Sequence, residues 1–330
     1  MDIDVLRVSG KNQWKRLDEL TRARVLSGED IDELDRLYRS ATTDLARVRT
    51  VSPDPDVIAE LSRILSAARG RLAGTGGLTG AVIARFFVVS LPLALYRIRW
   101  VILGVMAVFI ALCAIQAHYM MTTPEAMNEL GSPERLRTYA QSEFVEYYSQ
   151  DTHAEFGVSV WANNAWITLI SIGTGITGFF PLKILWDNAV SLGTSTAVVI
   201  TYGGAWHFFR FILPHGVPEL TAVFISIAAG LRIFWAFLVP GPASRFQAVG
   251  QAARAAMTVA VGCAILLAGS GFLEGFVTPS ELPDALKISL GLLLTVAAWA
   301  YILLLGRRAD RAGQSSDVGT DAGYYQPVSG

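Results

Sequence analysis

The sequence predicts an all-α, polytopic helical membrane protein. Hydrophobic residues make up 52% of its 330 residues and charged residues only 17%, and the mean hydropathy is +0.42. These values lie outside the range of an ordinary soluble domain. Apolar runs of about 20 residues, the length that an α-helix needs to cross a bilayer, recur from residue 100 onward. The charges between these runs alternate in sign from loop to loop, as in a multi-pass protein.

Residues 1–75 carry charge throughout and predict a small cytoplasmic helical region with three amphipathic helices. We expect these helices over 13–26, 30–50 and 57–68, because apolar residues recur there every three or four positions. Asp30 is the expected N-cap of the middle helix, with Glu33 completing a capping box. Three such helices form either a solvated bundle at the membrane or a docking platform for a cytoplasmic partner. The expected apolar faces comprise Trp14, Leu17 and Leu20; Ile31, Leu34, Leu37, Tyr38, Ala41, Leu45 and Val48; and Val57, Ile58, Leu61, Ile64, Leu65 and Ala68.

Residues 76–99 predict an interfacial elbow helix. The run Val82–Tyr96 is apolar, but Arg85 and Pro92 interrupt it, and arginines follow it. Such a segment fits the cytoplasmic leaflet, where arginines reach anionic headgroups. The alternative is a true span.

The transmembrane domain is expected over 100–306, followed by a disordered cytoplasmic tail over 307–330. The loop 122–159 carries seven acidic residues against two arginines, and most of the remaining basic residues fall on the opposite side if the spans alternate. This positive-inside pattern predicts a multi-pass protein of the inner (cytoplasmic) membrane with both termini in the cytoplasm. The six expected spans are 100–121, 160–181, 183–204, 218–239, 255–276 and 286–305.

Polar residues near the outer face form one candidate site. His215 and Glu219 lie four residues apart, so a helix would present them on one face, where they could share a proton or hold a cation. Pro214 and Pro218 are expected to interrupt the helix there, after an interfacial or re-entrant elbow over 203–213. The site is either functional or a polar tie between broken helices, and whether it binds a metal is left open. Its candidate residues are Asn163, Asn164, His215, Gly216 and Glu219.

A second, inner polar layer comprises Lys183, Asp187, Asn188 and Arg232. Arg232 is expected to be level with Asp187 and Asn188, which predicts a charge-assisted contact between helices. The competing contact is the intrahelical pair of Lys183 with Asp187. This layer also is either a structural tie or a functional site.

Other motifs favour structure over chemistry. The run 173–178 matches the dinucleotide fingerprint G-x-G-x-x-G, but it lies in a predicted span with no strand before it. Ser171 and Gly175 there are expected to let two membrane helices approach closely. Cys113 and Cys263 lie in apolar runs and are expected to be packing residues. No cofactor and no nucleic-acid partner are expected.

The chain contains the motif Pro-His-Gly-x-x-Glu at 214–219, followed by Gly230-Leu231-Arg232. Together with several other stretches, this motif resembles the stage II sporulation protein M family of bacterial and archaeal membrane proteins. The similarity covers almost the whole chain except the tail, and the motif Pro-His-Gly-x-x-Glu at 214–219 is its most specific part. The family often has Asn-Gly where this chain has Asn188-Ala189, so any role of that glycine does not carry over. The other matching stretches are Trp14, Leu37–Arg47, Asn163-Asn164, Asp187-Asn188 and Leu192-Gly193.

The resemblance implies a membrane anchor like that of the best-known members, which hold a complex of cell-wall hydrolases during engulfment. We therefore expect a non-enzymatic scaffold of the cell envelope. Its candidate partners are the lipid bilayer, a second copy of the chain in a homodimer, and envelope-remodelling proteins. The alternative is a transport or lipid-translocation protein with a hydrated site at His215, Glu219, Asn163 and Asn164. An intramembrane metal hydrolase, with His207 as third ligand, is a more distant alternative.

Overall fold

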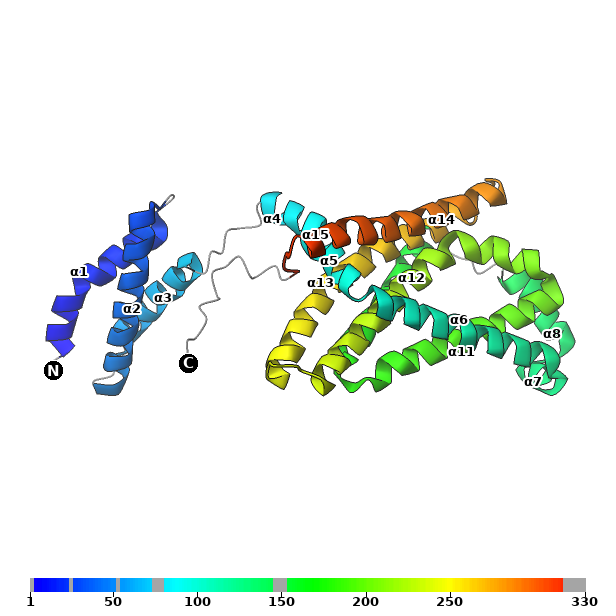
Figure 1. Cartoon of the computed structure of the whole chain (residues 1–330), viewed down its shortest axis with the longest axis horizontal. Helices are drawn as coiled ribbons and strands as arrows, with labels where there is room; N and C mark the ends of the chain where they lie inside the picture. Colours follow the sequence, from blue (N-terminus) through cyan, green and yellow to red (C-terminus); the bar gives the residue numbers. More distant parts are fainter. Residues whose placement is uncertain (1–2, 24–25, 52–53, 73–79, 145–152, 317–330) are drawn as a thin grey trace. The chain divides into compact units, whose positions relative to one another are not determined.

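The computed structural model describes residues 3–23, 26–51, 54–72, 80–144 and 153–316, and the described residues form helices and no strand (Figure 1). The all-α prediction is confirmed. The chain divides into two compact units, Met1–Ile83 with the last twelve residues, and Ala84–Val318.

The N-terminal unit contains helices α1 (Ile3–Arg22), α2 (Gly28–Val51) and α3 (Pro55–Leu72), which pack against one another. All three expected apolar faces contribute to one core, and the described structure confirms them with one exception. Ile31 is 49% exposed, because it lies in the first turn of α2, beyond the packed face. The buried core comprises Trp14, Leu17, Leu20, Leu34, Leu37, Ala41, Val48, Val57, Leu61, Ile64, Leu65 and Ala68.

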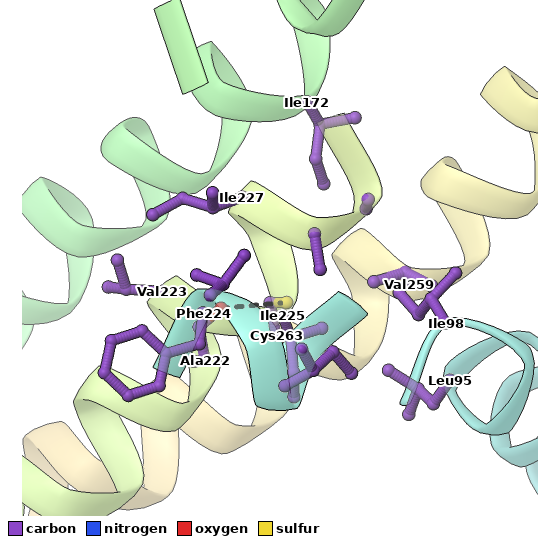
Figure 2. Close-up of a cluster of buried hydrophobic side chains, with 14 of the residues drawn as sticks. Leu95, Ile98, Ile172, Ala222, Val223, Phe224, Ile225, Ile227, Val259 and Cys263 are labelled. Atoms are coloured by element: carbon purple, nitrogen blue, oxygen red, sulfur yellow. Dashed lines mark hydrogen bonds between the residues drawn. The ribbon is translucent and has the colours of Figure 1, made fainter. Parts of the chain in front are cut away.

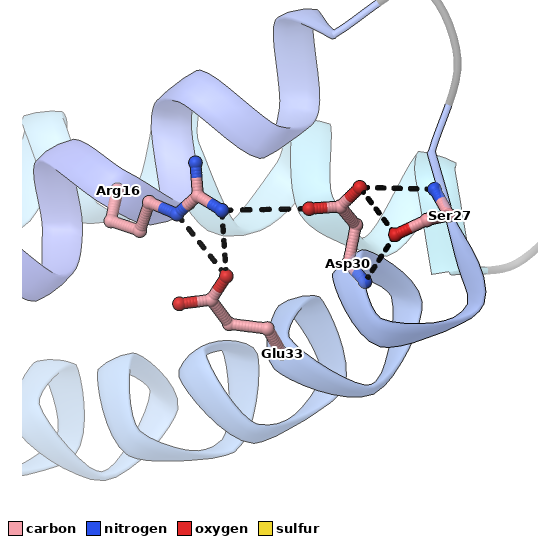
Figure 3. A network of polar contacts seen from close by, with 4 residues as sticks. All are labelled: Arg16, Ser27, Asp30 and Glu33. Atoms are coloured by element: carbon pink, nitrogen blue, oxygen red, sulfur yellow. Dashed lines mark hydrogen bonds and ion pairs between the residues drawn. The ribbon is translucent and has the colours of Figure 1, made fainter.

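The start of α2 differs from the expected cap. Ser27 precedes the helix: its hydroxyl accepts from the Asp30 amide at 3.2 Å, and the Asp30 carboxylate accepts from the Ser27 amide at 3.0 Å (Figure 3). The capping box therefore begins three residues earlier than predicted, with Asp30 in its third position. Hydrogen bonds from the backbone and hydroxyl of Ser27 lower the pKa of Asp30. The stability that this cap contributes is therefore lost in acid, when the pH falls through the lowered pKa and the Asp30 carboxylate is protonated. Glu33 instead pairs with Arg16 of α1 at 2.8 Å.

Residues 80–144 and 153–316 form a longer series of helices (Figure 1). Those labelled η1, η2, η4 and η5 are π-helical turns, and η3 is a 3₁₀ turn. In chain order the elements are α4 (Gly80–Arg85), η1 (Phe86–Ser90), α5 (Leu91–Arg97), α6 (Arg99–Thr122), α7 (Pro124–Leu130), α8 (Pro133–Thr138), η2 (Tyr139–Glu143), α10 (His153–Gly173), η3 (Gly175–Thr177), α11 (Phe179–Gly203), α12 (Ala205–Leu238), α13 (Arg245–Phe272), η4 (Leu273–Val277), α14 (Asp284–Tyr301), η5 (Ile302–Gly306) and α15 (Arg307–Arg311).

Four of these stretches are long and apolar enough to cross a membrane: α6, α12, α13 with η4, and α14 with η5 and α15. The other two predicted spans correspond to α10 and α11, which contain 21 and 25 residues but are not among the four. The six-span topology therefore stays a prediction. Residues 307–311 continue the last helix, and the predicted tail from residue 317 lies outside the described residues.

The segment predicted as an interfacial elbow forms α4, η1 and α5. Phe87 and Val88 are exposed, as lipid-facing side chains would be, whereas Leu91 and Leu95 are buried. The Tyr301 hydroxyl donates to the Phe87 carbonyl, which ties the segment to the end of α14. Its position at the bilayer surface stays a prediction.

Helix α12 is the centre of this unit. Every residue from Thr221 to Gly230 is buried, and α12 packs against α6, α10, α11, α13 and α14. Figure 2 shows part of the core around it, where the Cys263 thiol of α13 donates to the Ala222 carbonyl at 3.5 Å. Cys263 is thus a packing residue, as expected.

The predicted helix break at Pro214 and Pro218 is wrong, whereas the interfacial or re-entrant position predicted for residues 203–213 stays a prediction. The chain turns at Gly204, whose φ of 92° favours glycine, and α12 then continues through Pro214 and Pro218. Because Pro218 has no N–H, the Pro214 carbonyl loses its usual helical donor. Gly291 of α14 lies against that oxygen, where a Cβ would come within 2.1 Å. A neighbouring helix thus covers the exposed backbone, which lets a membrane helix tolerate proline.

The glycine-rich run 173–178 was predicted to lie inside the span 160–181. This prediction is wrong, because the run forms a turn between α10 and α11. Helix α10 ends at Gly173, and Gly178 adopts a φ of 66° at the start of α11. The expected close approach does occur there, because a Cβ on Gly175 would lie 2.7 Å from the Gly230 Cα of α12.

The separate core of the N-terminal unit predicts that residues 1–79 fold without the rest of the chain. Leu61→Ala, at a fully buried position, should lower the free energy of unfolding by about 2–5 kcal/mol. Ile31→Ala is the matched control on an exposed position and should change it by less than about 0.5 kcal/mol. Urea unfolding of residues 1–79 can be followed by the fluorescence of Trp14, because this segment contains no other tryptophan. Equal effects of the two substitutions would contradict the assigned core.

Candidate functional site

We call the second compact unit, Ala84–Val318, the membrane unit. Three side chains from two parts of this unit meet in one polar cluster. His215 and Glu219 come from α12, and Glu274 comes from η4, which follows α13 directly. One ligand atom of each lies within 4.8 Å of those of the other two. His215 and Glu274 are buried, with 4% of each residue exposed, and Glu219 is partly buried. We call these three residues the His-Glu-Glu cluster.

Asn164 of α10 joins the cluster, and Asn163 does not. The Asn164 amide donates to a Glu219 carboxylate oxygen at 2.8 Å, and Asn164 is buried. Asn163 is exposed, because neighbouring helical residues differ by about 100° in direction and only one of the two can face α12. The sequence pair thus contributes a single residue to the site.

The hydrogen bonds of His215 determine where its ring proton lies. The Thr278 hydroxyl has one proton, which it donates to the Leu273 carbonyl at 3.1 Å. We therefore assign the 3.2 Å contact between His215 Nδ1 and the Thr278 oxygen to a proton on Nδ1. In the neutral ring this leaves Nε2 with its lone pair, facing Glu274. The Ser270 hydroxyl also donates to the His215 carbonyl at 2.8 Å, which ties α13 to α12.

Glu274 is the main functional residue that sequence reasoning missed. Its Oε1 lies 3.7 Å from His215 Nε2, beyond hydrogen-bonding distance. Its Oε2 is buried and has no hydrogen-bond partner within the described part of the chain. The signal was available, because Glu274 is an ionisable residue inside the predicted span 255–276.

Lys287 of α14 lies nearby and was also missed. It is buried, and its ammonium donates to the Thr278 backbone carbonyl at 2.9 Å. Across the described residues no ion pair joins it to Glu219 or Glu274. Lys287 therefore holds the backbone of the residue that orients His215.

Gly216 and His207 do not supply ligand atoms to the cluster. Gly216 is buried, and a Cβ there would come within 2.9 Å of the Ile212 side chain, so its role is in packing. His207 contacts the Ala140 carbonyl at 3.1 Å through Nε2 and Arg210 at 3.4 Å through Nδ1. The position considered for His207 in a metal site is occupied by Glu274.

The inner polar layer forms only in part. Lys183 pairs with Asp187 at 2.5 Å within α11, and the Asn188 amide donates to the Ile184 carbonyl at 2.8 Å. Arg232 is exposed, and no hydrogen bond or ion pair between described residues joins it to Asp187 or Asn188. The predicted contact between helices is wrong, because the intrahelical partners four residues away are closer.

The His-Glu-Glu cluster contains one imidazole nitrogen and two carboxylates, which can hold a cation or a shared proton. A family model described as "Stage II sporulation protein M" matches residues 100–279, more than half of the chain and the whole of this cluster. The chain belongs to the stage II sporulation protein M family. This family consists of membrane proteins, which agrees with the four apolar helices.

A second family model, described as a domain of unknown function (DUF8413), matches residues 7–74. These residues cover most of α1, α2 and α3, so the match agrees with the separate N-terminal unit. No curated protein and no solved structure matches the chain.

Two adjacent asparagines provide a matched test of this site. Asn164→Ala should lower the free energy of unfolding by about 1–3 kcal/mol, because it removes a hydrogen bond to a carboxylate inside the helix bundle. Asn163→Ala removes the same group from an exposed position and should have little effect. Thermal unfolding of the purified protein in detergent measures both. A larger loss for Asn163→Ala would contradict the assigned geometry.

Proposed function

We propose that this member of the stage II sporulation protein M family is a non-enzymatic scaffold that recruits envelope-remodelling proteins to the inner membrane. The membrane unit anchors the chain, and the N-terminal helices and the acidic segment after α6 bind the partners. A second copy of the chain is part of the proposal, as a homodimer.

The observation that carries this proposal is the division of the chain into two compact units. The first is a helical bundle with its own core and its own family match, and nothing in its fold requires a membrane. A bundle attached to a membrane anchor is suited to bind a partner while the anchor fixes its location.

The acidic segment after α6 supplies a second surface. Helices α7 and α8 are not a loose loop, because Met127 and Leu136 are buried in a cluster with Met120 of α6 and Val198 of α11. This packing presents the side chains of Glu125, Glu129 and Glu134 to solvent. A partner with basic residues would suit this surface.

The proposed topology has six spans, with both termini in the cytoplasm. In support, the beginning of α6 and the end of the α14–α15 helix line one cavity of about 720 Å³, so the first and last spans have those ends on the same side. That arrangement requires an even number of crossings. The cavity is rich in arginine, as expected for the cytoplasmic side, and includes Arg99, Arg307, Arg308 and Arg311.

The scaffold proposal can be tested by cross-linking in cell membranes followed by purification and mass spectrometry. A chain lacking residues 1–79, or a Glu125→Gln, Glu129→Gln, Glu134→Gln variant, should lose cell-wall hydrolases or other envelope proteins that the full chain retains. The His215→Ala, Glu219→Ala double variant should retain them, because it leaves both surfaces intact. If that variant inserts and folds normally but loses the same partners, a scaffold separable from the polar site is excluded.

Translocation of a proton or cation is a second candidate function, favoured by one observation. Asn164, Thr168 and Ser171 form a polar stripe on the face of α10, and all three are buried. The hydroxyl oxygens of Thr168 and Ser171 have no hydrogen-bond partner among the described residues. The stripe begins at Glu219 and ends where Ser171 contacts Gly230, so it could line a hydrated path along α12.

Flux measurements in reconstituted vesicles test this second function. A proton or cation flux that the full chain supports should be abolished by Glu219→Gln, which removes the charge and keeps the shape of the side chain. Glu125→Gln, on the exposed acidic surface, should leave the flux unchanged. The absence of flux for protons and for mono- and divalent cations would eliminate translocation.

A further inference from the structure

We propose that His215, Glu219 and Glu274 bind one divalent transition-metal ion, of the zinc, iron or manganese class, inside the membrane unit. The inference concerns this cluster only and depends on neither function proposed above. It rests on the spacing of the three groups, the orientation of each by a neighbour, and a buried carboxylate oxygen without a partner.

The spacing fits a metal ion better than direct contacts. Metal–nitrogen and metal–oxygen bonds of about 2.0–2.2 Å place tetrahedral ligand atoms about 3.3–3.6 Å apart. His215 Nε2 and Glu274 Oε1 lie 3.7 Å apart, which is too long for a hydrogen bond and within a few tenths of an ångström of that separation. All three ligand atoms lie within 4.8 Å of one another, so small side-chain rotations would close the set.

The histidine presents the correct nitrogen. Metal-binding histidines donate their other ring N–H to a neighbouring oxygen, which fixes the tautomer and the ring orientation. His215 does this through Nδ1 to Thr278, and its unprotonated Nε2 faces Glu274. Lys287 in turn holds the Thr278 backbone.

The carboxylates are also placed for a cation. Asn164 fixes Glu219 by donating to one of its oxygens, which leaves the other carboxylate oxygen for a ligand bond. Glu274 is 4% exposed, and its Oε2 has no partner in the described structure. Two carboxylates this close repel each other and lose hydration, and a bound cation would compensate for both effects.

The donor set limits the kind of metal. One imidazole with two carboxylates suits zinc, iron or manganese, whereas a thiolate-rich set would favour copper(I). The nearest buried thiol, Cys263, is directed to the Ala222 carbonyl. A metal here would tie η4 to α12, and through Asn164 it would also hold α10.

Cobalt(II) and zinc(II) titrations of the full-length protein, purified in detergent without a histidine tag and stripped of metal with a chelator, test the proposal. We expect one ion per chain with a Kd of about 1 µM or lower, a visible cobalt absorption that zinc displaces, and a melting temperature that rises with zinc. No binding by the wild-type chain at micromolar metal would overturn the proposal, whatever the variants do.

Single substitutions locate the ion. His215→Gln, Glu219→Gln and Glu274→Gln should each weaken binding at least about tenfold. His118→Gln and Glu281→Gln are matched controls on exposed positions and should bind as the wild type does. If a control loses the ion, or if Glu274→Gln keeps full affinity and the zinc-dependent rise in melting temperature, the metal is held at another site and the proposal is wrong.

Discussion

The constraint that shapes the membrane unit is the presence of ionisable side chains within an apolar helix bundle. His215, Glu219, Glu274 and Lys287 come from three parts of the chain, and each is buried or partly buried. Such groups cost several kcal/mol each unless neighbours satisfy them. Asn164, Thr278 and backbone carbonyls do so for three of them, and Glu274 retains an oxygen without a partner in the described structure. This cluster is where α10, α12, η4 and α14 must be positioned together.

The two proline residues show how the same constraint acts on the backbone. Pro214 and Pro218 directly precede His215 and Glu219 and remove two donors from α12, yet the helix is continuous. Gly291 of α14 covers the Pro214 carbonyl, which lacks its helical donor, and Ser270 of α13 adds a hydrogen bond to the His215 carbonyl. The packing of α13 and α14 on α12 therefore both preserves the helix and brings Glu274 to His215. The N-terminal unit, with an apolar core of its own, is free of these requirements.

The sequence predicted the features that depend on local periodicity. The three N-terminal helices, nearly all of their buried faces, and the positions of the long apolar helices follow from spacings of three, four and about 20 residues. It failed where partners distant in the chain decide. Proline at 214 and 218 predicts a break unless Gly291 is known to pack there, and Asn163 cannot be distinguished from Asn164 without the direction of α10. Glu274 was visible as a charge in an apolar run, but its proximity to His215 depends on how α13 packs against α12.

The cluster fixes His215 as the Nδ1–H tautomer with Nε2 directed at Glu274. Nitrogen-15 NMR of ring-labelled histidine in the bilayer-reconstituted protein measures this directly. The chain has four histidines, and the signals that disappear in the His215→Gln variant belong to His215. We expect a proton-bearing Nδ1 and an Nε2 without a proton, and zinc should shift the Nε2 signal the most. A proton on Nε2, or a ring protonated at both nitrogens at neutral pH, would contradict this assignment.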